Sequence, residues 1–197
     1  GARLPPPAAP PGTRATELGN AEGTCVGREG EWNGRVARAG VPHPFLRHGW
    51  MRTWWDNVSG GARLHIVVIR DDTRIVAIAP LMRESTRMYG IPVTRLRLMQ
   101  NDHTPRIDFI IAGRAQESYQ AIWNALRHGD LSWDVLQLSQ IPRTSPTIGV
   151  VTRWAAADKL ATGTWNSSDS PYLELTGTWD DYLASLSAKF RSNVRNR

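Results

Sequence analysis

Residues 64–83 read LHIVVIRDDTRIVAIAPLMR, two apolar runs separated by five polar residues. Both runs, 64–69 and 75–82, are rich in Val and Ile, whose branched side chains suit a pleated sheet. Each run is short and bounded by a turn signal, so the pattern predicts an antiparallel β-hairpin. Neither run alternates cleanly between apolar and polar residues, which indicates that both faces of the hairpin are covered. We therefore expect this hairpin at the centre of a sheet, although the same pattern is compatible with a buried hairpin in any α/β protein.

The flanking sequence predicts helices and further strands around this hairpin. Apolar residues recur at helical spacing in 31–39, 46–58, 116–127 and 178–186, with a further helix from 187 onward. On the second of these helices we expect Leu46, Trp50, Trp54 and Val58 to share one face. Strands are predicted at 93–99, 107–112, 133–138 and 170–175, with loops at 83–92 and 100–106. The fold class is therefore α/β (α+β), with a mixed, largely antiparallel central sheet and helices on both faces.

The N-terminal segment 1–30 differs in composition from the rest of the chain. It contains Pro5-Pro6-Pro7 and Pro10-Pro11 and has no apolar period, so we expect a disordered, Pro-rich tail that adds nothing to the core. The expected organisation is a tail over 1–30, a first domain over 31–168, and a second segment over 169–197. The basic helix from 187 onward reaches the end of the chain without a stop signal, so this second segment is expected to be the start of a truncated domain.

Charge and composition exclude several functional classes. The net charge is +6, and four of the cations, Lys189, Arg191, Arg195 and Arg197, lie within the last nine residues. Basic residues gathered in a terminal helix disfavour an extended nucleic-acid-binding face. No run approaches the ~20 apolar residues of a membrane helix, and no secretory signal is visible. Cys25 is the single cysteine, which is compatible with a reducing compartment, so we expect a cytoplasmic protein without a transmembrane segment.

Familiar catalytic motifs do not occur in this sequence. The histidines at 43, 48, 65, 103 and 128 lack zinc-site spacing and cysteine partners, so no metal is expected. There is neither a Gly-rich phosphate loop nor a G-x-S-x-G elbow. Nine tryptophans are a high number, and they indicate either an aromatic sugar-binding surface or, for at least six of them, core packing.

Two clusters remain as candidate sites. In NDHTPRID, residues 101–108, Asp102 or His103 is a candidate general base, Arg106 a candidate anion-binding residue, and Asp108 an acid that needs a partner if it is buried. The competing interpretation is a solvated turn that uses Asn, Asp and Pro for backbone reasons. The second cluster is the basic helix, where Lys189, Arg191 and Arg195 could grip an anionic substrate or simply form a solvated helix face.

Several of these stretches together resemble the CelD/BcsL-type acetyltransferases of the GNAT superfamily, which are associated with bacterial cellulose and exopolysaccharide production. The resemblance covers about residues 31–197. It rests on PFL and GW at 44–50 with WW at 54–55, on IVAIAPL at 75–81, on N-D-x-x-x-R-x-D-F at 101–109, and above all on SPYLEL followed by TWDDYLASLSAKFRSNVRNR. This last match is the most specific, because it joins a strand, a capped helix and a basic helix in the family's order.

The resemblance implies a GNAT-like fold and an acyl-CoA-dependent N- or O-acetyltransferase that acts in polysaccharide or cell-envelope biosynthesis. Family members look like two GNAT-like halves in tandem, so this chain would be the first half with the start of the second and would be inactive without its C-terminal partner half. The family's pyrophosphate loop, R/Q-x-x-G-x-G/A before a helix, is not matched. The nearest segment, 87–92, fails at Pro92.

The resemblance therefore places the acetyl-CoA site beyond Arg197 or in a degenerate loop. The implied mechanism is direct transfer, in which an amine or hydroxyl of a small-molecule or polysaccharide-precursor acceptor attacks the thioester. The catalytic residue stays open among Asp102, His103 and Asp108. The alternative function is a non-catalytic, Trp-rich carbohydrate- or partner-binding domain.

Overall fold

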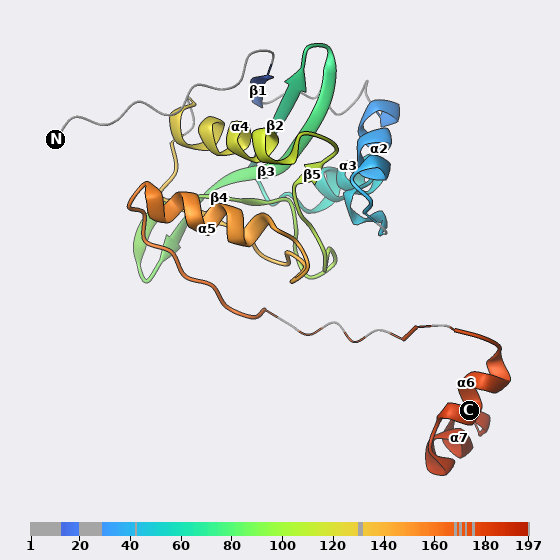
Figure 1. The fold of residues 1–197 in the computed structure, drawn as a ribbon. Helices are drawn as coiled ribbons and strands as arrows, with labels where there is room; N and C mark the ends of the chain where they lie inside the picture. The colour runs from blue at the N-terminus through green and yellow to red at the C-terminus, as the bar shows by residue number, and fades with distance from the viewer. Residues whose placement is uncertain are drawn as a thin grey trace. The chain divides into compact units, whose positions relative to one another are not determined.

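The computed structural model describes residues 13–19, 29–41, 43–129, 132–167, 169, 171, 173–174 and 176–196. The chain forms two compact units, Gly1–Trp165 and Asn166–Arg197. The first unit contains a sheet and its covering helices (Figure 1). The second contains two short helices.

The central hairpin is the one predicted from the sequence. Strand β2 (Arg63–Asp71) pairs antiparallel with β3 (Arg74–Met88), and Asp71 lies opposite Arg74 across a two-residue turn. Residues 65–69 and 77–82 are buried in succession, with no exposed alternate positions. The prediction that both faces of this hairpin are covered is therefore confirmed.

The sheet has the order β1-β2-β3-β4-β6. Strand β1 (Thr13–Gly19) pairs antiparallel with β2, and β4 (Ile91–Leu98) pairs antiparallel with β3. The short β6 (Val135–Gln137) pairs parallel with β4. Because β1 belongs to the sheet, the predicted disordered tail over residues 1–30 is wrong for Thr13–Gly19. Cys25 lies outside the described residues.

Strands β3 and β4 extend beyond the rest of the sheet as a two-stranded ribbon. The segment 83–92 was predicted to be a loop, but Arg83 to Met88 pair with Leu96 to Ile91, and the turn consists of Tyr89 and Gly90. Both turn residues have positive φ, 51° and 84°, as a tight hairpin turn requires. The prediction failed because ribbon residues that face water on both sides are polar, and polar residues also mark loops.

Strand β5 (Ile110–Ile111) continues the line of β4 along β3. Leu98 lies opposite Leu81, and Ile110 lies opposite Ile78, so residues 99–109 leave the ladder and return to it. At the two ends of this excursion, the Met99 N–H donates to Pro80 O (3.0 Å) and the Ala112 N–H donates to Val76 O (2.8 Å). The strand predicted over 107–112 is therefore reduced to two residues.

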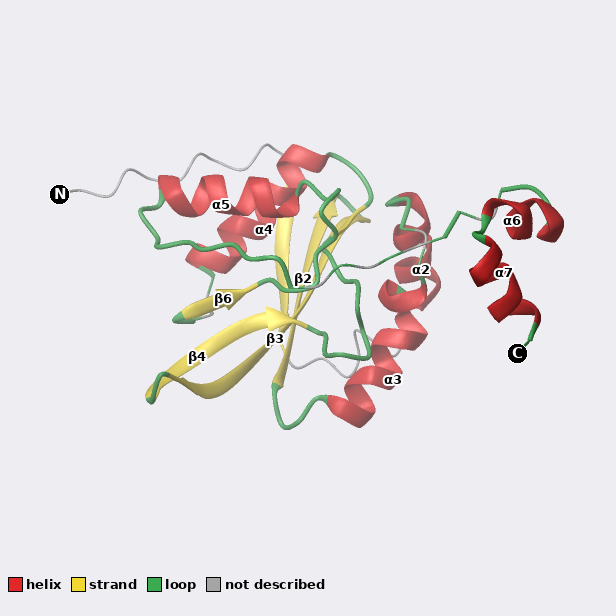
Figure 2. Cartoon of the chain, turned by 90° about the horizontal axis from the view of Figure 1, so that it is seen from below, coloured by secondary structure: helices red, strands yellow, loops and turns green. Residues whose placement is uncertain are grey.

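Helices cover both faces of the sheet, with α2 and α3 on one side and α4 and α5 on the other (Figure 2). Helix α2 (Glu29–Arg38) buries Trp32 and Val36, and the 3-10 turn η1 (Pro44–Leu46) leads into α3 (His48–Val58). On α3 the predicted inward face is partly wrong. Trp54 and the preceding Leu46 are buried, but Trp50 and Val58 are exposed, and Met51 takes the inward position.

The other face is covered by α4 (Ala115–His128) and α5 (Thr147–Ala157). Helix α4 ends before Gly129, one residue beyond the predicted range of 116–127, and buries Tyr119, Ile122, Trp123 and Leu126 among other residues. Val150, Val151 and Trp154 of α5 pack against the core. The predicted fold class, a mixed and largely antiparallel sheet with helices on both faces, is confirmed.

The second unit contains α6 (Trp179–Ser185) and α7 (Ala188–Arg195). Thr178 and Asp181 form a capping box, in which the Asp181 N–H donates to Thr178 Oγ1 (3.3 Å) and the Thr178 N–H donates to Asp181 Oδ2 (2.8 Å). The strand predicted over 170–175 is wrong for its described residues, since Pro171, Leu173 and Glu174 lie in no strand.

Candidate functional site

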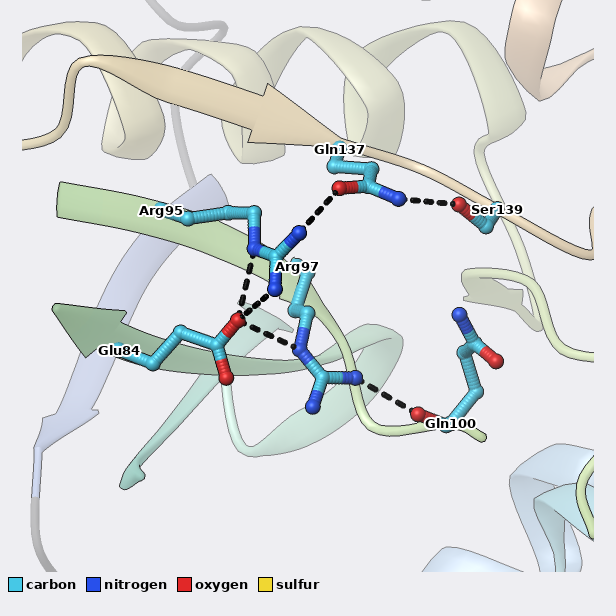
Figure 3. A network of polar contacts seen from close by, with 6 residues as sticks. All are labelled: Glu84, Arg95, Arg97, Gln100, Gln137 and Ser139. Carbon is cyan, nitrogen blue, oxygen red and sulfur yellow. Dashed lines mark hydrogen bonds and ion pairs between the residues drawn. The ribbon is translucent and has the colours of Figure 1, made fainter. Parts of the chain in front are cut away.

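A charged network lies on one face of the sheet where β4 runs beside β6 (Figure 3). Glu84 of β3 lies opposite Arg95 of β4, and Arg97 lies next to Gln137 of β6, so their side chains share a face. Arg95 donates from Nε to Glu84 Oε1 (2.7 Å), and its Nη2 forms a further ion pair with the same oxygen. Its Nη1 donates to Gln137 Oε1 (2.9 Å), so every guanidinium nitrogen of Arg95 has a partner.

Arg97 completes the network from the next outward position of β4. Its Nε lies 3.2 Å from Glu84 Oε1, and its Nη1 donates to the backbone oxygen of Gln100 (2.6 Å). Two guanidiniums thus share one carboxylate, which leaves one positive charge in excess. The three charged side chains are 18–26% exposed, so the ions are held partly out of water.

The sequence predicted a strand over 93–99, but it did not identify Arg95 and Arg97 as a site. Their partner Glu84 lay in the segment predicted to be a loop. The available signal was the alternation R-L-R at 95–97, which places two cations on one side of a strand.

Replacing Glu84 by Gln tests how far this network stabilises the fold. The amide keeps the shape but removes the charge that holds two partly buried guanidiniums, so we expect a loss of about 1–2 kcal/mol in the free energy of unfolding. The matched control is Asp56→Asn, whose pair with Arg52 on α3 is exposed and is expected to contribute less than about 0.5 kcal/mol. Equal effects of the two variants in urea denaturation would contradict this prediction.

Asp108 lies partly buried at the end of the excursion that separates β4 from β5. Its Oδ1 accepts from the Thr147 hydroxyl (2.6 Å) and from the Phe109 N–H (2.7 Å). The oxygen of Thr147 lies 2.7 Å from the hydroxyl of Tyr119, so Tyr119 donates to Thr147 and Thr147 donates to Asp108. Burial raises the pKa of the Asp108 carboxyl, while hydrogen bonds from Ser145, Thr147 and Phe109 oppose that rise. The predicted need of Asp108 for a partner is thus met by Thr147 of α5, which is bonded in turn to Tyr119 of α4.

The other two candidate bases, Asp102 and His103, are exposed. Their turn is anchored from α3, because the Trp54 indole N–H donates to Asn101 Oδ1 (2.9 Å) and the Trp50 indole N–H donates to Thr104 Oγ1 (3.1 Å). Asp108 is therefore hydrogen-bonded to Thr147, whereas Asp102 and His103 lie exposed in the same segment, residues 99–109.

Arg106, the candidate anion-binding residue, lies near His43 at the start of η1. Burial and, to a lesser extent, the Arg106 charge lower the pKa of His43. A lowered pKa keeps this imidazole neutral near pH 7, because its ordinary value is already below that pH. His43 was not considered as a site residue, since nothing in the sequence places it beside Arg106.

A short turn over residues 112–114 joins β5 to α4. Residues 110–115 read IIAGRA, and Ala115 is the first residue of α4. Arg114 has φ 43° and pairs with Asp71 through its side chain (3.2 Å).

The basic residues of the second unit differ in their surroundings. Lys189 is exposed, whereas Arg191 donates from Nη1 to the backbone oxygens of Ala184 (3.1 Å) and Leu186 (2.6 Å). Arg191 therefore satisfies carbonyls at the end of α6. Arg195 is the last residue of α7.

The tryptophans support core packing over an aromatic binding platform. Trp32, Trp54 and Trp123 are buried, and Trp55, Trp133 and Trp154 pack against the core, as predicted for six of the nine. Trp50 lines an open groove of about 420 Å³ together with Asn33, Arg47 and Thr53, but its neighbours Trp54 and Trp55 point elsewhere. The three tryptophans of α3 therefore do not form one flat exposed surface.

Across the part of the chain that the structure describes, no three His, Cys, Asp or Glu residues are grouped as metal ligands. Within the same residues, no helix has the length and apolar character needed to cross a membrane.

Comparison with known proteins gives the following results. No family model and no curated protein matches it. The chain is similar in fold to the crystal structure of ribosomal-protein-alanine N-acetyltransferase from Brucella melitensis biovar Abortus 2308, at 13% sequence identity and a TM-score of 0.42. The match covers 81% of this chain and 99% of that protein.

Proposed function

We propose that this chain is part of an acyl-CoA-dependent acyltransferase of the GNAT type, which acetylates an amine or hydroxyl in polysaccharide or cell-envelope biosynthesis. The sequence resemblance to CelD/BcsL-type acetyltransferases suggests this chemistry. In this proposal the chain contributes the acceptor side, and the C-terminal GNAT-like half beyond Arg197 completes the acetyl-CoA site. The protein is proposed to be cytoplasmic and bacterial.

The observation that supports the proposal most is that the parallel strands β4 and β6 separate after a short paired stretch. They pair only from Arg95 to Arg97, opposite Val135 to Gln137, and then separate. Beyond that point the chains following the two strands meet again, where the Ile107 N–H donates to Gln140 O (3.2 Å). In open sheets ligands bind outside the carboxyl ends of parallel strands. The charged network lies at this pair of strands. The hydrogen-bonded residues Tyr119, Thr147 and Asp108 lie in the segments that follow the two strands.

Acyl transfer to an amine or hydroxyl needs a group that accepts the nucleophile's proton and donors that stabilise charge on the thioester oxygen. Bound acyl-CoA would supply the activated thioester. Asp108 is the favoured proton acceptor, because burial raises the pKa of its carboxyl toward the working pH. Asp102 and His103 remain alternatives for the base, while Arg106, Lys189, Arg191 and Arg195 are proposed to hold anionic groups of the substrates.

The test compares this chain with a longer natural chain that continues past Arg197. We expect the longer chain to bind acetyl-CoA in calorimetry and to release the CoA thiol when a polysaccharide precursor is added. We expect little turnover from residues 1–197 alone. In the longer chain, Asp108→Asn is expected to lower kcat by about 100-fold or more, as for loss of a general base. Asp56→Asn, at an exposed carboxylate of α3 that has no proposed catalytic role, serves as the matched control. A longer chain that binds no acyl-CoA would remove the proposal.

A further inference from the structure

We propose that Glu84 and Arg97 form a binding site for two neighbouring hydroxyl groups, such as the vicinal diol of a sugar. The idea that the diol belongs to the acyl acceptor rests on the proposed function. The idea that Glu84 and Arg97 bind a diol does not depend on that function. It assigns a ligand class to the network on β3 and β4.

Within the described part of the chain, the network leaves one oxygen of Glu84 and two nitrogens of Arg97 without a hydrogen bond, and one of these nitrogens, Nε, is buried. Glu84 Oε1 takes all the contacts from Arg95 and Arg97, while Oε2 accepts no hydrogen bond from any described residue. Arg97 Nε lies 3.2 Å from Glu84 Oε1 as an ion pair without a hydrogen bond, Nη1 donates to the backbone oxygen of Gln100, and Nη2 donates to no described residue. Figure 3 shows Oε2 and Nη2 on the same side of the network, away from Gln137. Because both side chains keep about one-fifth of their surface in solvent, a small ligand can reach them.

The remaining polar atoms are held rigidly by their neighbours. Arg95 is fixed by Glu84 and Gln137, and Gln137 in turn donates from Nε2 to the Ser139 hydroxyl (3.0 Å). Arg97 is held by the hydrogen bond from Nη1 to Gln100 and by the ion pair with Glu84. The orientation of the free oxygen and the free N–H is therefore set before a ligand arrives, which lowers the entropy cost of binding.

An acceptor beside a donor favours a particular chemistry. A phosphate or carboxylate would accept from Arg97 but would be repelled by the negative oxygen of Glu84. An ammonium group would donate to Glu84 but would be repelled by the positive guanidinium of Arg97. A hydroxyl both donates and accepts. Of two adjacent hydroxyls, one donates to Glu84 Oε2 and the other accepts from Arg97 Nη2, so both charged groups gain a hydrogen bond without repulsion. A primary amide also offers a donor and an acceptor and is therefore the competing ligand in the test.

The experiment titrates the 197-residue chain with trans-1,2-cyclohexanediol and follows the Arg97 Nε–H signal by NMR, assigned from its absence in Arg97→Lys. We expect a saturable shift with the diol, and at least about tenfold weaker binding of cyclohexanol, which has a single hydroxyl. Cellobiose is expected to shift the same signal. No acyl-CoA is present, so this outcome is independent of whether the longer chain transfers an acyl group.

Two controls decide whether the site is the one named. In Arg97→Lys, the backbone amide signals of the neighbouring strands should no longer show a saturable shift when the diol is added. Arg87→Lys should keep this shift, because Arg87 lies at the ribbon tip, where its Nη1 donates to Gly90 O. Equal response to diol and cyclohexanol, or tighter binding of propionamide than of the diol, would overturn the proposal. The ligand series is measured on the native chain, so it holds even if a variant fails to fold.

Discussion

Replacing Leu81 by Ala is expected to lower the free energy of unfolding by about 3–4 kcal/mol. Leu81 is fully buried in the middle of β3, opposite His65 of β2 and Leu98 of β4. Truncation leaves a cavity between strands that are packed on both faces, so the surrounding side chains have little freedom to close it. Urea denaturation followed by circular dichroism gives the change in unfolding free energy.

The matched control for this substitution is Ile91→Ala at the tip of the β3–β4 ribbon. Ile91 is 65% exposed, so we expect a loss of less than about 0.5 kcal/mol. If Leu81→Ala were as mild as Ile91→Ala, the central hairpin would not be the core of the sheet.

Replacing Thr147 by Val is expected to destabilise the protein by about 2–3 kcal/mol at pH 7. Thr147 is buried at the first turn of α5 and joins the hydroxyl of Tyr119 to the carboxylate of Asp108. Valine has the same shape but no hydroxyl, so Asp108 loses a donor and Tyr119 loses its acceptor. The control on the same helix is Thr152→Val, whose hydroxyl bonds the backbone oxygen of Ile148 at an exposed position and should change stability by less than about 0.5 kcal/mol.

The Thr147→Val effect should depend on pH in a defined direction. Burial raises the pKa of Asp108 in the folded state above the ordinary value of 3.8, so the ionised carboxylate disfavours folding. This penalty is present above the folded pKa and disappears as the pH falls through it toward the unfolded value. Thr147 donates to the carboxylate and opposes the rise, so its removal raises the pKa further. The destabilisation should therefore be largest near pH 7 and shrink on acidification, and a pH-independent difference would contradict the assignment of Asp108.

Local patterns were sufficient for much of the fold. The Val/Ile-rich runs predicted β2 and β3, and helical spacing with stop signals predicted α2, α3 and α4. The capping box at Thr178 was also readable, because the two residues that form it are three positions apart. The ribbon over 83–92 could not be separated from a loop, since an exposed two-stranded hairpin is as polar as a loop.

The candidate site depended on contacts between distant residues. Glu84, Arg95 and Gln137 lie on three strands that meet only when β6 pairs parallel with β4. Asp108, Tyr119 and Thr147 come from an excursion and two helices, and sequence reasoning could state only that Asp108 would need a partner.

The amino-acid sequence alone determined where hydrogen-bonded strands and amphipathic helices form, because those preferences act between residues a few positions apart. The tertiary structure alone decided which polar groups meet and which atoms of Glu84 and Arg97 stay free. Sheet register and helix packing bring residues together over separations of about 10 to 50 positions, and no short sequence pattern encodes them.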